Sequence, residues 1–231
     1  MSAAYYHPDD LSGMDCGATI GWADVMKQLK QEVPPDRLKV LDGMNVEMNA
    51  RRGKSTEVKI TWANGEPTNK QTLEDGTKQM IGGFFQTYWP IAGASMAPAK
   101  SDTVHVEARD GGGYTLHTNS AGTVVTEEVD RDLVPIKINV NSPAMIVGMV
   151  PHFTPSPNPV AGDLRWLTGL DVTTRIGTST TNAGFTIEYQ TIGGYHIPQR
   201  FSINVGGAYS VPVELIGCSV SKDVIVAPPT K

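Results

Sequence analysis

The sequence predicts a mainly β protein with two or more helices, in which one antiparallel, strongly curved sheet forms an incomplete barrel wrapped around the helices. Short segments of alternating apolar and polar residues recur between residues 43 and 222. The connections between these segments are mostly short, whereas parallel strands would need long crossovers. The 24 glycines and 16 prolines among 231 residues suit a chain with many turns.

We expect a single domain covering residues 1–231, because β proteins of this length commonly fold as one unit. Its N-terminal segment, 1–42, is predicted to be helical. The sheet is expected over 43–222 with a helical insertion at 77–90, and residues 223–231 are expected to form a tail.

The first helix is predicted from an apolar stripe with helical spacing, which Pro34 and Pro35 end. The stripe consists of Trp22, Val25, Met26, Leu29 and Val33. A helix with one apolar face should lie against a sheet or across the mouth of a cavity.

The next two predicted segments are strands joined by a hairpin turn over 51–55. Val46 and Met48 alternate with polar residues before the turn, and Val58, Ile60 and Trp62 do so after it. Gly53-Lys54-Ser55 in the turn resembles the end of a phosphate-binding loop. That motif needs a glycine where Met48 stands and a strand followed by a helix, so we reject a phosphate-binding loop here.

Residues 77–90 interrupt the strand pattern with a helical stripe of large apolar side chains that ends at Pro90. The stripe consists of Met80, Ile81, Phe84, Phe85, Tyr88 and Trp89. Gly82 and Gly83 lie in its middle, where each costs a helix about 1 kcal/mol relative to alanine. The segment is either a packed core helix or a movable lid or wall of a cavity. We predict a lid or wall, because six large side chains exceed what one docked helix face needs.

From residue 103 onward the pattern predicts nearly continuous strand. Gly193-Gly194 is expected to form a two-residue hairpin turn, because glycine readily adopts the positive φ angles required there. Pro198 should lie at an edge or a bulge, since it cannot donate to a ladder. The apolar alternation changes phase at Ile216-Gly217, which predicts a β-bulge that helps to curve the sheet.

Composition and charge exclude several classes of function. The net charge of −5 and the scattered Lys and Arg residues argue against binding of nucleic acid. No apolar run reaches the roughly 18–20 residues that a membrane-spanning helix needs. The first ten residues lack the features of a signal peptide, so we expect either a cytosolic protein or an exported protein whose signal peptide is absent from this sequence.

The two cysteines, Cys16 and Cys218, lie near opposite ends of the sequence and match no zinc or redox motif. They are either two unrelated buried thiols or a disulfide that fastens the N-terminal segment to the last strand. We predict the disulfide, which would persist only in an oxidising compartment.

No catalytic, metal or cofactor site is recognised in the sequence. Hydrolase, zinc-protease, dinucleotide and EF-hand motifs are missing. His105 and His117 on neighbouring predicted strands could meet across a ladder with Glu107, but solvated strand faces explain them more simply. The acidic residues Asp9, Asp10 and Asp15 are interpreted as a solvated tail.

The second half, from about Val104 to Val220, resembles the periplasmic lipoprotein-carrier (LolA-like) superfamily, which includes the outer membrane lipoprotein-sorting proteins. The resemblance rests on the run of strands and on Tyr189, Gly193-Gly194 and Ile197-Pro198, followed by an alternating strand. It implies an incomplete barrel around helices, an apolar cavity for acyl chains and a location outside the cytoplasm. No binding residue is carried over from the family, because the segment before Gly43 and residues 77–90 do not align.

The sequence therefore predicts a non-enzymatic, monomeric, periplasmic or secreted carrier that holds a lipid or lipidated ligand in an apolar cavity. The expected cavity residues are Trp62, Met80, Phe84, Phe85, Tyr88, Trp89, Met145, Met149 and Trp166. The alternative is an exported interaction or structural module whose core is filled by its own side chains. A hydrolase with an unrecognised site is a third, weaker hypothesis.

Overall fold

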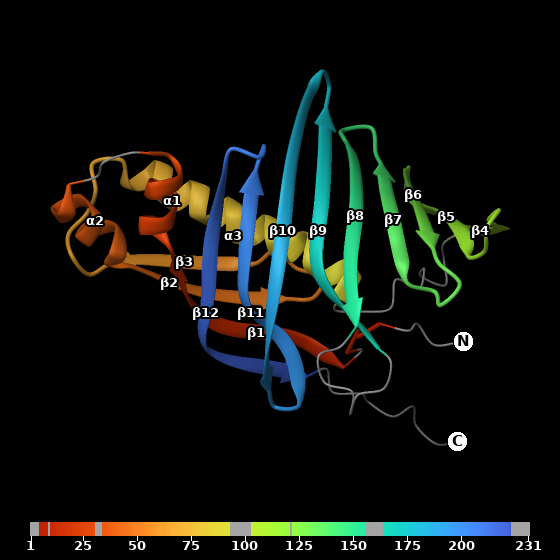
Figure 1. Ribbon diagram of the computed structural model, residues 1–231, viewed down its shortest axis with the longest axis horizontal. Helices are drawn as coiled ribbons and strands as arrows, with labels where there is room; N and C mark the ends of the chain where they lie inside the picture. Colours follow the sequence, from red (N-terminus) through yellow and green to blue (C-terminus); the bar gives the residue numbers. More distant parts are fainter. Residues whose placement is uncertain are drawn as a thin grey trace. The chain divides into compact units, whose positions relative to one another are not determined.

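A computed structural model describes residues 5–8, 10–30, 34–92, 103–120, 122–155 and 164–222. These residues form three helices and twelve strands (Figure 1). In chain order the elements are β1 (Leu11–Ile20), α1 (Trp22–Gln28), α2 (Pro35–Asp42), β2 (Met44–Arg51), β3 (Glu57–Trp62), α3 (Lys70–Ala92), β4 (Thr103–Ala108), β5 (Tyr114–Ser120), β6 (Thr123–Val129), β7 (Pro135–Asn141), β8 (Ile146–Pro155), β9 (Arg165–Ile176), β10 (Ser179–Ile192), β11 (Tyr195–Val205) and β12 (Tyr209–Lys222).

All twelve strands belong to one sheet with the order β3-β2-β1-β12-β11-β10-β9-β8-β7-β6-β5-β4. Each pairing for which a register is defined is antiparallel. The first and last strands of this order do not pair, so the sheet is open. The predicted fold class, mainly β with an incomplete antiparallel barrel and helices, is confirmed. None of the helices in the described residues is long and apolar enough to cross a membrane.

The chain divides into two compact units. The helical unit comprises His7–Ala94, Glu188–Phe201 and Val211–Lys231, and the all-β unit comprises Met1–Tyr6, Ser95–Ile187 and Ser202–Ser210. Strands β10, β11 and β12 contribute residues to both units. The predicted tail at 223–231 lies outside the described residues.

The helical unit contains a strand, β1, that the sequence analysis missed by expecting only helix in residues 1–42. β1 lies between β2 and β12 and pairs with both. Its alternation is obscured because its pairing with β12 is irregular at two places, between Leu11 and Gly13 and between Asp15 and Gly17. The first irregularity adds a residue to β1, so the buried positions change from Leu11 and Gly13 to Met14, Cys16 and Ala18, and a single period of two is lost in the sequence.

The N-terminal helices also differ from the single helix expected at Trp22–Val33. α1 ends at Gln28, and Lys30 has a positive φ of 51°, which a helix cannot continue through. A second helix, α2, then starts with Pro35 in its first turn. The proline pair therefore begins a helix instead of ending one, because proline in the first turn lacks only an N–H that needs no helical partner.

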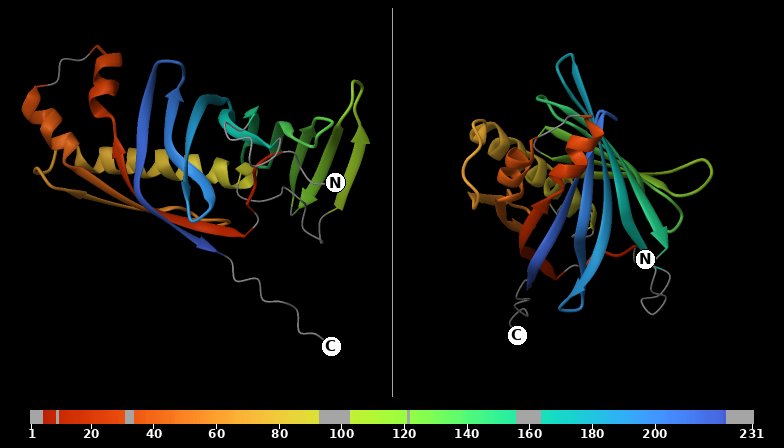
Figure 2. Two further views of the ribbon diagram at one scale, coloured as in Figure 1. Left: turned by 60° about the horizontal axis from the view of Figure 1, so that its bottom comes forward. Right: turned by 60° about the vertical axis from the view of Figure 1, so that its left-hand side comes forward.

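α3 spans Lys70–Ala92, longer than the predicted 77–90, and lies along the sheet of the helical unit (Figure 2). The indole Nε1 of Trp62 on β3 donates to Glu74 at 3.0 Å, and ten residues later Phe84 stacks on Phe201 of β11. Ten helical residues span about 15 Å. The four strand spacings from β3 to β11 span about 19 Å along the sheet. The two lengths are similar, so α3 crosses the strands from β3 to β11 and contacts both of these strands through its side chains.

The predicted hairpin and bulge are both present in the helical unit. Gly193 and Gly194, with φ angles of 59° and 86°, connect β10 and β11. Asp15 pairs with Ser219 and Gly17 with Ile216, so β12 carries one extra residue opposite Cys16. Gly217 adopts a φ of 58° there. Pro198 is not at an edge, because β11 lies between β12 and β10.

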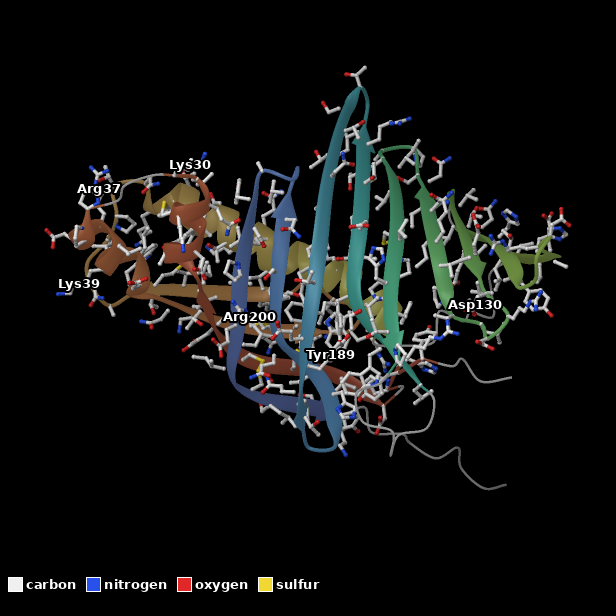
Figure 3. The ribbon with its side chains drawn as sticks, viewed as in Figure 1. Lys30, Arg37, Lys39, Asp130, Tyr189 and Arg200 are labelled. Carbon is white, nitrogen blue, oxygen red and sulfur yellow. A yellow bond between two sulfur atoms is a disulfide. The ribbon has the colours of Figure 1, made fainter. Side chains whose placement is uncertain are left out.

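The sheet of the all-β unit has one buried, apolar face and one exposed face, because successive side chains along a strand point to opposite sides of the sheet. Ile138 and Met149 pair across β7 and β8 on the apolar face, and both are buried. The turn before β7 is held by Asp130, labelled in Figure 3. Its Oδ1 accepts the Val134 backbone N–H at 2.9 Å, and its Oδ2 accepts an Arg165 N–H at 2.8 Å.

Candidate functional site

The large side chains of the α3 stripe form an aromatic cluster in the core of the helical unit. Phe84 and Phe201 stack with ring centroids 3.9 Å apart, and Phe85 meets Phe84 edge-on at 4.9 Å. Tyr88 stacks beside Phe84 at 5.6 Å. Phe84, Phe85 and Tyr88 are at most 2% exposed. These aromatic side chains therefore fill space that the sequence analysis assigned to a cavity.

Beside this cluster lies a cleft of about 470 Å³, here called the α3 cleft. Its lining comes from the β2–β3 hairpin and from the last turns of α3. The lining residues are Arg52, Gly53, Lys54, Ser55, Phe85, Gln86, Trp89 and Pro90. Its volume falls in the range of roughly 300–1,000 Å³ that is typical of small-molecule sites.

Two buried polar atoms near the α3 cleft have no hydrogen-bond partner among the described residues, the Nε1 of Trp89 and the Oγ1 of Thr56. Trp89 lines the cleft and is only 4% exposed. A buried donor without a partner costs about 1–3 kcal/mol, so such groups are normally satisfied by protein, water or ligand. Pro90 also interrupts the hydrogen bonding of α3, because it has no N–H to donate to the Gln86 carbonyl one turn earlier.

The other predicted cavity residues do not gather at this cleft. In the helical unit, the Trp62 indole donates a hydrogen bond to Glu74, and Met80 is half-buried on α3. In the all-β unit, Met149 and Trp166 are buried, but Met145 precedes β8 and is 42% exposed. Of the nine residues expected to line the cavity, the structure thus places only Phe85 and Trp89 on the α3 cleft.

A buried carboxyl group in the all-β unit, that of Glu127, is the strongest electrostatic anomaly among the described residues. Glu127 pairs across the ladder with Leu116 and Ile138, so its side chain lies on the apolar face. It is 8% exposed, and burial raises the pKa of its carboxyl group to about 7. The sequence Val125-Thr-Glu-Glu-Val129 indicates this burial. Because side chains alternate along a strand, one of the two adjacent glutamates must lie on the same face as the two valines.

The histidine pair that the sequence analysis considered does meet across β4 and β5. His105 pairs with His117, and their ring centroids are 6.3 Å apart. The Glu107 carboxylate lies 3.1 Å from the His105 Nε2 and 3.9 Å from the His117 Nε2. The described residues nevertheless hold no group of three or more side chains arranged to bind a metal.

The disulfide between Cys16 and Cys218 joins neighbouring strands β1 and β12, with a Cα–Cα distance of 4.2 Å. The acidic residues near it are not a solvated tail. Asp15 lies within β1 and accepts two hydrogen bonds from Arg51, and Asp10 accepts one from the Tyr195 hydroxyl at 2.5 Å. Asp9 is outside the described residues.

No family model, curated protein or solved structure matches this chain. The candidate site therefore rests on geometry alone. Helical spacing in the sequence predicts the apolar stripe that contains Phe85 and Trp89, but no local pattern predicts the hairpin side of the cleft. Arg52 and Lys54 lie more than 30 residues before Trp89, and only the folding of α3 along the sheet brings the two segments together.

Proposed function

We propose that this protein is a non-enzymatic binding or carrier protein that holds the apolar part of a lipid or lipidated ligand in the α3 cleft. The observation that carries this proposal is the lining of the cleft, in which a polar hairpin adjoins Phe85 and Trp89. Among the described residues the Trp89 Nε1 has no hydrogen-bond partner. Apolar walls with a few polar groups are the usual composition of a ligand site.

The energetics favour ligands with an alkyl chain. Burying one CH₂ group contributes about 0.8 kcal/mol, so a fully buried eight-carbon chain would contribute about 6 kcal/mol before the costs of association. Because the floor is aromatic and offers few polar partners, affinity should rise with chain length until the cleft is filled.

We also propose that the protein works outside the cytoplasm, as the resemblance to the lipoprotein-carrier superfamily implies. The Cys16–Cys218 disulfide supports this location, because disulfides persist in oxidising compartments and are rare in the cytosol.

Mass spectrometry of lipids extracted from the purified native protein tests the proposal directly, and a recurrent co-purifying amphiphile is expected. In a second test, protein stripped of lipid is titrated with 1-octanol while tryptophan fluorescence is recorded. We expect a saturable change that disappears in Trp89→Phe and persists in Trp62→Phe, because Trp62 does not line the cleft. Extracts free of lipid together with an unresponsive Trp89 would refute binding in the α3 cleft.

A second candidate function is an interaction or structural module without a small ligand. The observation that favours it is the packing of Phe84, Phe85 and Tyr88, since this part of the core is filled by the protein itself. A failure of both ligand tests would leave this module as the better proposal.

A further inference from the structure

We propose that the α3 cleft selects amphiphiles whose headgroup is an anion of the phosphate or carboxylate type, bound at the hairpin rim. This inference rests on the proposed function, because it names the headgroup chemistry of the ligand whose apolar part occupies the same cleft.

The charge of the rim is the first argument. Arg52 and Lys54 both line the α3 cleft, whereas none of the described residues that line it is Asp or Glu. Lys54 is exposed and forms no ion pair within the part of the chain that the structure describes. Two cations beside a low-polarity floor attract an anion more strongly than the same charges would in open solvent.

The hydrogen-bonding groups point to the same chemistry. The Trp89 Nε1–H can only donate, and so can the Arg52 guanidinium and the Lys54 ammonium. The Ser55 hydroxyl on the hairpin can also donate. An oxyanion at the rim can accept hydrogen bonds from Arg52, Lys54 and Ser55, whereas a quaternary ammonium headgroup accepts none and is repelled by the cations.

The end of α3 fixes where the headgroup would lie. The carbonyl groups in the last turn of a helix carry partial negative charge and disfavour an anion nearby. The headgroup should therefore sit against the hairpin, on the side of Arg52 and Lys54, with the alkyl chain running over Phe85 and Trp89.

Isothermal titration calorimetry of the full chain with three ligands of equal chain length tests this inference. The ligands are octyl phosphate, 1-octanol and octyltrimethylammonium, and inorganic phosphate is titrated as a headgroup without a chain. We expect octyl phosphate to bind about tenfold or more tightly than 1-octanol, because hydrogen bonds to charged groups are the strong ones.

The decisive variant is Arg52→Gln/Lys54→Gln, and its matched control is Lys27→Gln/Lys39→Gln. Both variants remove two positive charges from the helical unit, but Lys27 and Lys39 do not line the cleft. The first should lose the preference for octyl phosphate while retaining 1-octanol binding, and the control should keep the preference. If the double variant is poorly folded by circular dichroism, Lys54→Glu alone replaces it, since that side chain is exposed.

The outcomes separate the two proposals. Equal affinity for all three alkyl ligands would overturn the anion selectivity and leave the apolar cleft in place. Inorganic phosphate binding as tightly as octyl phosphate would also overturn the inference, because the ligand would then be a free anion. If none of the alkyl ligands binds, the proposed function itself fails and the headgroup inference fails with it.

Discussion

Replacing Glu127 by glutamine should make the stability of the protein less sensitive to pH. The Glu127 carboxyl lies on the apolar face of the all-β unit between Leu116 and Ile138, and burial raises its pKa from 4.5 to about 7. A raised pKa in the folded state means that folding disfavours the charged form. Glutamine has nearly the same shape and carries no charge, so it removes this penalty.

The size and sign of the effect follow from linkage. At pH values between 4.5 and 7 the unfolded chain has released the Glu127 proton and the folded chain retains it, so stability falls as pH rises. Below about pH 4.5 the penalty is absent, and above about pH 7 it is complete. The shift is about 2.5 pKa units. At 1.36 kcal/mol per unit, this corresponds to about 3 kcal/mol.

Urea unfolding of the wild type and of Glu127→Gln at pH values from 4 to 8 measures the effect, and the difference between the two proteins cancels the other titrating groups. We expect the variant to gain about 3 kcal/mol relative to the wild type between pH 4 and pH 8. Glu128→Gln is the matched control, because the Glu128 side chain lies 2.9 Å from Arg109 on the other face. A difference between wild type and Glu127→Gln that stays constant with pH would refute a buried, uncompensated carboxyl group.

Three further predictions concern the helical unit. Gly82→Ala/Gly83→Ala should stabilise it by roughly 1–2 kcal/mol in urea unfolding, because both sites are helical and an added Cβ would meet no atom within 4 Å beyond the adjoining helix backbone. A destabilised variant would argue against this helix geometry. Cys16→Ser/Cys218→Ser should lower the free energy of unfolding by up to about 5 kcal/mol, because the disulfide joins residues 202 positions apart and so closes a long loop. An unchanged urea midpoint under oxidising conditions would contradict this prediction. Phe201→Ala should lower the free energy of unfolding, measured with urea, by about 3–5 kcal/mol, because Phe201 is 1% exposed and its removal leaves a cavity beside α3. A decrease below about 1 kcal/mol would show that the aromatic cluster is loosely packed.

The sequence predicted those parts of the fold in which local pattern and tertiary environment agree. The Gly193-Gly194 turn and the bulge at Gly217 each need a positive φ, which leaves a recognisable glycine. β1 was missed because the irregularity between Leu11 and Gly13 changes the phase of its alternation near the start of the strand. α2 was missed because Pro35 was interpreted as a stop signal, although proline suits the start of a helix equally well.

The candidate site was predicted less completely than the fold. Helical spacing identified the apolar stripe of α3, but it could not distinguish Phe84, which packs on Phe201, from Trp89, which lines the cleft. That distinction depends on which element lies opposite each turn of the helix. Likewise Lys54 was examined only as part of a phosphate-binding loop, because its proximity to α3 is a property of the folded chain.

The bond between β1 and β12 also constrains when the helical unit can be completed during synthesis. Cys218 leaves the ribosome 202 residues after Cys16, so β1 cannot pair with β12 until nearly all of the intervening chain has been synthesised. At roughly 5–20 residues per second this delay is on the order of 10–40 s. Throughout that interval the edge of β1 that later pairs with β12 is open to other strands, because early pairing with β2 covers only the opposite edge. Once the bond has formed, a protease that cuts any loop between the two cysteines leaves both fragments attached.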